Sequence, residues 1–376
     1  KSLLRIRAML EAIRNRYWSY HGRIESRFPF NRSLNLRRAL FLTCKIGALG
    51  YWLPLELTKW LNKSVVNARY LEALEPDSGD ILLLLDSSWH GDFFDFVREL
   101  KGRDVGVVSV IYDLIPITHP QFCDEHLVKV FNGWLDWMVE CADGYIAISR
   151  TIAEEFRVVL LDRLGDPGEK TRWVDSFYLG ADFEQKAAVI VRDSVKAVFT
   201  SNSNVYLTVS TIEPRKNHAY MIDAFELLWQ EGHQVSLCVV GKVGWKTEAL
   251  VDRIHNHPEF GRRLIMLNDL SDAELEYCYE YARALIFASY VEGFGLPLVE
   301  AAQRGLPVLC SDIPVFREIG GEACHYFDLS QPSTLKHVLL DFQALAGQEL
   351  QRRAPVEWIS WQQSAQQLVD VVAAHA

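Results

Sequence analysis

Two glutamates stand on either side of a glycine-rich turn in SYVEGFGLPLVEAA, residues 289–302. Glu292 precedes the turn and Glu300 follows it, one turn into an expected helix. The start of that helix offers unpaired backbone N–H groups and the positive end of its dipole, which suits a phosphate. Gly293 and Gly295 have no Cβ, so their backbone can approach a ligand closely. Because carboxylates repel phosphate, we expect the glutamates to bind hydroxyl groups on its two sides.

The alternative interpretation of this peptide is a capped loop with two solvated acids. A second peptide, STIEPRKNH at residues 210–218, favours the ligand site because it follows a strand-like run. Arg215 and Lys216 are adjacent cations at a strand-to-helix turn and could neutralise a diphosphate as it leaves. Together the two peptides predict a site for hexose, diphosphate and ribose, the layout of a nucleotide sugar.

Short apolar runs separated by helical stretches predict the elements that position these residues. In the first half of the chain the runs are 80–86, 105–111 and 144–149. In the second half they are 205–211, 235–241, 264–268, 284–289 and 306–312. This alternation predicts an α/β protein with two doubly wound, Rossmann-like sheets in series.

A chain of 376 residues is too long for one ordinary core, so several domains are expected. We predict four segments: a basic, mostly helical segment 1–76, a first Rossmann-like domain 77–200, a second one 201–355, and a C-terminal helix 356–376 that packs back on the first domain. The sequence begins with Lys1 rather than Met, so a piece of a longer protein is one expectation.

The composition limits the class of partner. The net charge of −10 argues against nucleic acid as the main partner. Residues 1–45 are instead basic, with eleven Lys and Arg against two Glu, and aromatic residues are interleaved among them. Such a segment suits an anionic membrane surface, and a solvated helical face is the alternative. The seven scattered cysteines indicate small core residues in a reducing compartment, with no metal site.

The motifs EPRKN, GFGLPLVEA and PVLCSDIPVFREIGGEACHYFD (307–328) resemble those of retaining glycosyltransferases of family four, which have the GT-B fold. YDLIPITHP (112–120) and ADGYIAISRTIAEEF (142–156) resemble the bacterial subgroup that builds O-antigen, capsule and exopolysaccharide chains, mostly mannosyl- and rhamnosyltransferases. The resemblance covers about residues 78–370. It implies two Rossmann-like domains facing across a cleft.

The resemblance also implies residue roles. Glu292 corresponds to the glutamate that contacts the donor sugar, Glu300 to the one that holds the ribose, and Arg215 and Lys216 to the pair on the diphosphate. The catalytic group is therefore expected to be Glu292, Arg215 and Lys216. The expected donor-binding residues also include Gly293, Phe294, Gly295, Leu296, Ser149, Tyr112 and Asp113. Many relatives have His-Asp where this chain has Tyr112-Asp113.

The resemblance implies a cytoplasmic hexosyltransferase that uses a nucleotide sugar, GDP-mannose as first choice, and an oligosaccharide or lipid-linked glycan acceptor. The sequence has no Asp-x-Asp pair, so we expect neither a metal nor another cofactor, and a front-face mechanism. The alternatives are a UDP- or dTDP-sugar donor, a non-catalytic sugar-binding or scaffold module, and a dinucleotide-dependent oxidoreductase. The last needs a Gly-x-Gly-x-x-Gly motif after a first strand, and GKVGWK (241–246) does not supply it.

Overall fold

The computed structural model describes residues 76–85, 94–164, 172–182, 191–200, 204–345 and 356–375. The chain divides into two compact units between Glu75 and Pro76, and the described residues all belong to the second unit. The predicted helical segment that ends at residue 76, including the membrane contact through residues 1–45, lies outside the described residues except for Pro76.

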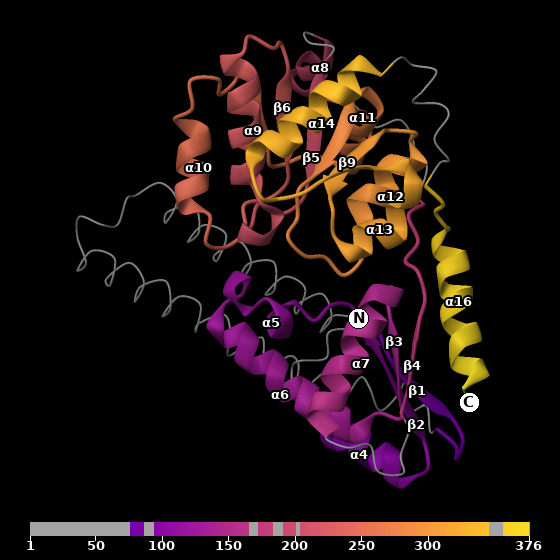
Figure 1. Ribbon diagram of the computed structural model, residues 1–376. Coiled ribbons are helices and arrows are strands. Elements are labelled where there is room, and N and C mark those ends of the chain that lie inside the picture. Colours follow the sequence, from indigo (N-terminus) through magenta and orange to yellow (C-terminus); the bar gives the residue numbers. More distant parts are fainter. Residues whose placement is uncertain are drawn as a thin grey trace, which may run out of the picture. The chain divides into compact units, whose positions relative to one another are not determined.

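Among the described residues, four parallel strands form the first sheet, in the order β1-β2-β3-β4. The strands are β1 (Ile81–Leu84), β2 (Gly106–Ile111), β3 (Gly144–Ala147) and β4 (Trp173–Ser176). The helices among them are α4 (Phe94–Gly102), α5 (Ile115–Thr118), η4 (Pro120–Phe122), α6 (Glu125–Cys141) and α7 (Arg150–Leu164). We call these elements the first half (Figure 1).

The second sheet, in the part of the chain that the structure describes, has six parallel strands: β5 (Val205–Val209), β6 (Ser236–Val240), β7 (Leu264–Leu267), β8 (Ala284–Phe287), β9 (Val308–Ser311) and β10 (His325–Phe327). The helices of this second half are α8 (Asp193–Thr200), η5 (Pro214–Lys216), α9 (His218–Gln230), α10 (Glu248–His255), α11 (Asp272–Tyr281), α12 (Leu296–Gln303), α13 (Pro314–Gly320), η6 (Gly321–Ala323) and α14 (Pro332–Ala344). The first sheet lies within the predicted segment 77–200 and the second within 201–355.

Every predicted strand is present, and two further strands complete the sheets. The sequence did not predict β4 or β10, which have four and three residues. Their residues WVDS and HYF carry no apolar run, so partner strands decide their conformation.

The strand order of the second sheet is β10-β9-β8-β5-β6-β7. The chain therefore leaves β5 in one direction as far as β7 and then returns to β8 on the other side of β5. Tyr206 of β5 pairs with Ala284 of β8 in parallel register. Open α/β sheets bind ligands outside the carboxyl ends of the strands at such a reversal. In this sheet that position lies between the loops that follow β5 and β8.

The C-terminal helix α16 (Trp361–Ala374) contacts the first half, as the fold prediction stated. Ser364 donates its hydroxyl hydrogen bond to the carbonyl of Tyr178 (2.6 Å), just after β4. A Cβ on Gly180 would lie 2.4 Å from the backbone nitrogen of Trp361. The helix can therefore lie this close only because residue 180 is glycine.

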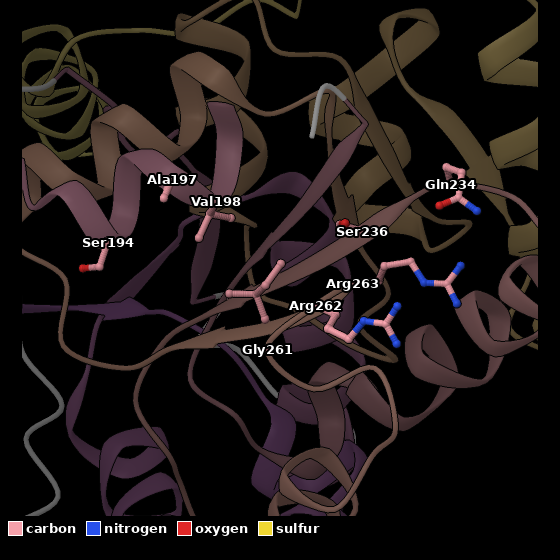
Figure 2. Close-up of a pocket in the computed structure, with 9 residues that line it drawn as sticks. Ser194, Ala197, Val198, Gln234, Ser236, Gly261, Arg262 and Arg263 are labelled. Atoms are coloured by element: carbon pink, nitrogen blue, oxygen red, sulfur yellow. The ribbon is translucent and has the colours of Figure 1, made fainter. Parts of the chain in front are cut away.

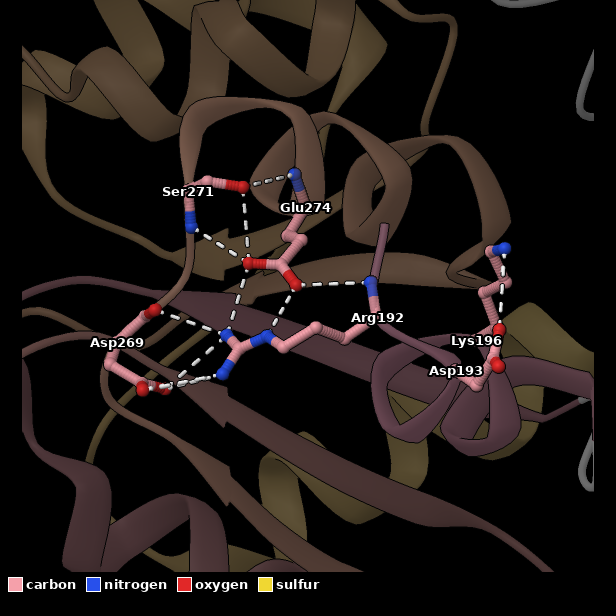
Figure 3. Close-up of polar contacts among 6 residues, drawn as sticks. All are labelled: Arg192, Asp193, Lys196, Asp269, Ser271 and Glu274. Atoms are coloured by element: carbon pink, nitrogen blue, oxygen red, sulfur yellow. Dashed lines mark hydrogen bonds and ion pairs between the residues drawn. The ribbon is translucent and has the colours of Figure 1, made fainter. Parts of the chain in front are cut away.

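Arg192 fastens the segment before α8 to the start of α11 (Figure 3). Its Nε lies 2.5 Å from Glu274 Oε1, and its Nη2 lies 3.0 Å from Glu274 Oε2. Glu274 also accepts from the backbone of Ser271, which in turn caps α11. The hydrogen bonds from Arg192, followed by those from Ser271, lower the pKa of Glu274 to about 2.

Within the described part of the chain, no helix is both long and apolar enough to cross a membrane. The six described cysteines are buried, in agreement with their interpretation as core residues.

We expect Gly180→Ala to lower the unfolding free energy by about 1–3 kcal/mol, because the new methyl group would meet the backbone at Trp361. Gly133→Ala is the matched control, since this glycine is inside α6 with open space around its Cβ position. The control should be neutral or stabilising by up to about 1 kcal/mol. Urea denaturation measures both, and equal effects would contradict the packing of α16.

Glu274→Gln should lower the melting temperature at pH 7, because the Gln side chain lacks the charge that pairs with Arg192. A carboxyl whose pKa is lowered in the folded state stabilises the fold above its unfolded pKa, near 4.5, and loses that stabilisation as pH falls toward about 2. The difference from wild type should therefore shrink below about pH 4.5. Glu280→Gln, at an exposed position of the same helix, is the control.

Candidate functional site

The cations and the first glutamate of the sequence motifs meet at the reversal of the second sheet. Arg215 and Lys216 belong to η5, which follows β5, and Glu292 lies in the loop after β8. Arg215 Nη1 lies 2.7 Å from Glu292 Oε2. Lys216 Nζ donates to Glu292 Oε1, which also accepts from the Ser289 hydroxyl at 2.7 Å. All three residues predicted as catalytic are therefore in direct contact.

Arg215 is held from two further directions. Its Nε lies 2.7 Å from Glu213 Oε1, and its Nη1 donates to the carbonyl of Val291 at 3.2 Å. The backbone nitrogen of Tyr290 in turn donates to the carbonyl of Arg215 at 2.9 Å. A guanidinium has more N–H donors than these contacts use, so Arg215 can bind a ligand phosphate without leaving Glu292.

Burial and charge oppose one another in this cluster. Burial acts to raise the pKa of Glu292, but the positive charges of Lys216 and Arg215 outweigh it and lower that pKa. Burial lowers the pKa of Lys216 in spite of the neighbouring Glu292 charge. Burial also raises the pKa of Glu213, against the attraction of the two cations. Of these two carboxyls, Glu292 is the one whose pKa the cations bring below its usual value.

The two glycines of the turn are explained by protein packing. A Cβ on Gly293 would lie 2.1 Å from the carbonyl oxygen of Tyr112, in the first half. Gly295 has φ of 101°, and a Cβ there would lie 2.8 Å from the ring of Phe316. Their role in admitting a donor stays a prediction, but the close approach that they permit here is to the protein itself.

The other residues of the turn divide between core and helix start. Phe294 is buried and belongs to the hydrophobic core that both sheets share. Leu296 is half-buried and begins α12, with Pro297 in its first turn, where the missing N–H costs little. For both residues a donor contact therefore remains a prediction.

Ser149 reaches the turn from the first half. It is fully buried, two residues after the end of β3, and its hydroxyl donates to the carbonyl of Gly293 at 2.9 Å. The same oxygen accepts from the backbone nitrogen of Ile152 at 3.2 Å. In this arrangement Ser149 joins the two halves beside Glu292, whereas the sequence predicted a residue that touches the donor.

Tyr112 and Asp113 follow β2 and face the same region. Tyr112 is exposed, and its hydroxyl donates to the carbonyl of Leu85. Asp113 is half-buried and accepts from the backbone nitrogen of Ile115 at 3.0 Å. Burial raises the pKa of Asp113, and the negative charge of Glu292 adds to the increase. Asp113 is thus an electrostatic neighbour of the cluster.

Glu300, in α12, has a partner in α11. It accepts a hydrogen bond from the hydroxyl of Tyr279 in α11 at 2.6 Å. Burial raises the pKa of Glu300, although Tyr279 and Arg304 oppose the increase. The sequence placed Glu300 correctly on the helix but gave no signal for Tyr279, which lies 21 positions earlier.

Ser289, Glu213 and Tyr279 contact the predicted site residues, and sequence reasoning did not select them. Glu213 lies in the peptide 210–218 and Ser289 in the peptide 289–302. Their closeness in sequence to the predicted site residues was therefore a signal that could have identified them. Among the described residues, no group of three or more His, Cys, Asp or Glu side chains is arranged to hold a metal ion.

A separate cavity of about 780 Å³ lies at the amino ends of β6 and β7 (Figure 2). Its lining includes Ser236, Arg262 and Arg263, and none of the predicted site residues. It therefore lies at the opposite ends of the strands from the cluster around Glu292.

Solved structures with a similar fold define the class. Sucrose-phosphate synthase from Thermosynechococcus elongatus matches with a TM-score of 0.55 at 16% identity, over 87% of this chain and 78% of that one. Anabaena Alr3699/HepE, solved in complex with UDP and glucose, matches with a TM-score of 0.54 at 17% identity, over 78% of each chain. With its two parallel α/β sheets, the chain has the GT-B fold of glycosyltransferases, as predicted.

Residues 191–325 match the family model described as Glycosyl transferases group 1, and the chain carries a domain of that family. The serotype-specific mannosyltransferase WbdA of Escherichia coli is 36% identical over 305 residues, which are 77% of this chain and 36% of that protein. The O-antigen chain mannosyltransferase B of Escherichia coli is 30% identical over 169 residues, 44% of each chain. The chain thus spans about a third of the length of its WbdA relatives.

Proposed function

We propose that this chain transfers mannose from GDP-mannose to a growing bacterial surface glycan of the O-antigen type, with retention of configuration. The observation that carries the proposal is the contact of Glu292 with both Arg215 and Lys216 at the reversal of the second sheet. The choice of mannose and of an O-antigen acceptor rests on relatives that are named for both.

The cations are proposed to hold the diphosphate of the donor. Glu213 and Glu292 cancel part of their positive charge, but both carboxylates also fix where the cations lie. Such preorganisation reduces the reorganisation needed as negative charge develops on the leaving diphosphate. The N-terminus of α12, beside the cluster, adds backbone N–H groups and a positive dipole end. In this proposal the protein's own groups carry the charge, with neither a metal nor another cofactor.

The contacts of Glu292 favour front-face transfer over a covalent intermediate. One of its oxygens accepts from Lys216 and Ser289, and the other accepts from Arg215. Such a carboxylate is a poor nucleophile, because cations already bind its lone pairs. In the proposed step the acceptor hydroxyl oxygen bonds to C1 as the bond from C1 to the diphosphate oxygen breaks. The hydroxyl proton moves to that departing oxygen, and Glu292 binds donor hydroxyls.

Glu300 is proposed to hold the ribose of the donor, with Tyr279 fixing the direction of its carboxylate. Asp113 and Ser149 approach from the first half, where the acceptor glycan is expected. An oligosaccharide or a lipid-linked glycan would both fit the proposed reaction.

A panel of nucleotides and nucleotide sugars tests the donor. GDP and GDP-mannose should raise the melting temperature, because a ligand that binds only the folded state stabilises it by about 2.7 kcal/mol at a concentration of 100 Kd. UDP-glucose and dTDP-rhamnose should leave it unchanged. Stabilisation by a UDP or dTDP compound alone would replace GDP-mannose with the alternative donor. No stabilisation by any member would contradict a donor site.

Glu292→Gln should reduce turnover about 100-fold or more, because the amide carries no charge to pair with Arg215 and Lys216. The affinity for GDP should change only a few-fold, since the phosphate-binding cations remain. Release of GDP from GDP-mannose in the presence of acceptor measures turnover, and calorimetry measures affinity. Glu280→Gln, an exposed change in the same half, is the control. Turnover within a few-fold of wild type would remove Glu292 from the mechanism. No turnover in the wild type either would favour a non-catalytic scaffold module.

A further inference from the structure

Glu318, in α13 of the second half, places its carboxylate at the start of α7 in the first half. Only 7% of its side chain is exposed. One oxygen accepts from the backbone nitrogen of Arg150 at 2.7 Å. The other accepts from the backbone nitrogen of Thr151 at 2.8 Å and from its hydroxyl at 2.5 Å. The two halves therefore share one buried carboxylate.

These contacts complete the cap of α7. The first N–H groups of a helix have no partner within the helix and usually bond to a side chain just before it. Here the preceding Ser149 accepts from Ile152, and Glu318 takes the two N–H groups before that. Glu318 lies 168 positions from Arg150 in the sequence. The start of α7 thus depends on the second half for its cap.

The capped residues connect directly to the turn that carries Glu292. Ser149 immediately precedes α7, and its hydroxyl holds the carbonyl of Gly293, the residue after Glu292. Two positions before Glu318, Phe316 lies against Gly295 at the other end of the same turn. The turn is therefore in contact with α13 through Phe316 and with the start of α7 through Ser149.

The charge of Glu318 matters for this cap. Burial acts to raise its pKa, but hydrogen bonds from Thr151, Arg150 and Tyr178 outweigh it and lower the pKa. An ionised carboxylate accepts hydrogen bonds at both oxygens, whereas a glutamine amide accepts at only one and presents N–H groups at the other. In a Gln at this position, the amide N–H groups would point toward the hydrogen-bond donors of Thr151 or Arg150 and could not accept hydrogen bonds from them.

We propose that Glu318 is a positioning residue for glycosyl transfer: it fixes the start of α7, and through Ser149 it holds the turn that carries Glu292. Glu318 contacts neither Glu292 nor the cations in this arrangement, so it acts through the backbone of residues 149–151 and 293. The kinetic part of this inference rests on the proposed function; the structural part does not.

Hydrogen–deuterium exchange on the full chain tests the structural part without any substrate. In Glu318→Gln, amides at 150–153 and 292–295 should exchange at least ten times faster than in wild type, while those of β6 stay unchanged. Asp312→Asn is the matched control, because the Asp312 carboxylate bonds to the exposed Arg317 of α13 rather than to the start of α7. Unchanged exchange at 292–295 in Glu318→Gln would overturn the proposal, whether or not a donor has been identified.

Kinetics with GDP-mannose test the positioning role. Glu318→Gln should lower kcat at least ten-fold while GDP affinity stays within about two-fold, because the cations are untouched. Ser149→Ala should lower kcat on its own, yet add less than two-fold in the Glu318→Gln background, since both changes break the same connection. If the effects of Ser149→Ala and Glu318→Gln on kcat multiply in the double variant, the proposal is overturned. An equal loss of kcat and GDP affinity in Glu318→Gln would also overturn it.

A variant that unfolds would leave the mechanism undecided, so Thr151→Val serves as a second, milder change. It removes one of the hydrogen bonds to Glu318 and keeps both backbone contacts. It should raise exchange at 292–295 and lower kcat in the same direction as Glu318→Gln, by a smaller factor. Wild-type exchange and kcat in Thr151→Val, together with an unfolded Glu318→Gln, would assign Glu318 to stability alone. If no donor supports transfer while the exchange results hold, the proposed function fails and the positioning contact remains.

Discussion

The structure depends on the ion pairs that Glu292 makes with Arg215 and Lys216. Removing one partner from a buried pair leaves the other charge in a medium that solvates it poorly, so the three side chains are mutually dependent. Lys216 and Glu292 are both more than nine-tenths buried. Their pairing fixes the loop after β8 on the turn after β5.

The loop that carries Glu292 is constrained from both halves of the molecule. Val291 is buried in a small cluster with Ile115 and Cys123 of the first half, and Gly293 lies against the carbonyl of Tyr112. In the second half, the ring of Phe316 packs against Gly295. A loop of this kind has little freedom, which agrees with the general expectation that a catalytic group must be held in place by rigid surroundings.

Carboxylates dominate the surroundings of the two cations, and this shapes the proposed chemistry. Glu213 and Glu292 pair with Arg215, while Asp113 lies close enough for its pKa to respond to Glu292. Burial raises the pKa values of Asp113 and Glu213. Glu292 retains its charge because two cations and the Ser289 hydroxyl stabilise it.

The sequence by itself determined the local part of this arrangement. Apolar runs predicted the main strands, and the peptides around Arg215 and Glu292 supplied the residue types of the candidate site. Both predictions succeed because neighbouring residues determine strand periodicity and helix starts. The sequence did not predict the short strands β4 and β10, because their pairing partners rather than their own residues decide their conformation.

Only the tertiary structure decided which distant groups meet. Arg215 and Glu292 are 77 positions apart and become neighbours because β8 returns beside β5. The contacts that explain Gly293, and the carboxylate of Glu318 on α7, likewise join residues from different halves. No pattern of neighbouring residues encodes such contacts, because they depend on the order of strands in the sheet and on the packing of one sheet's helices against the other's loops.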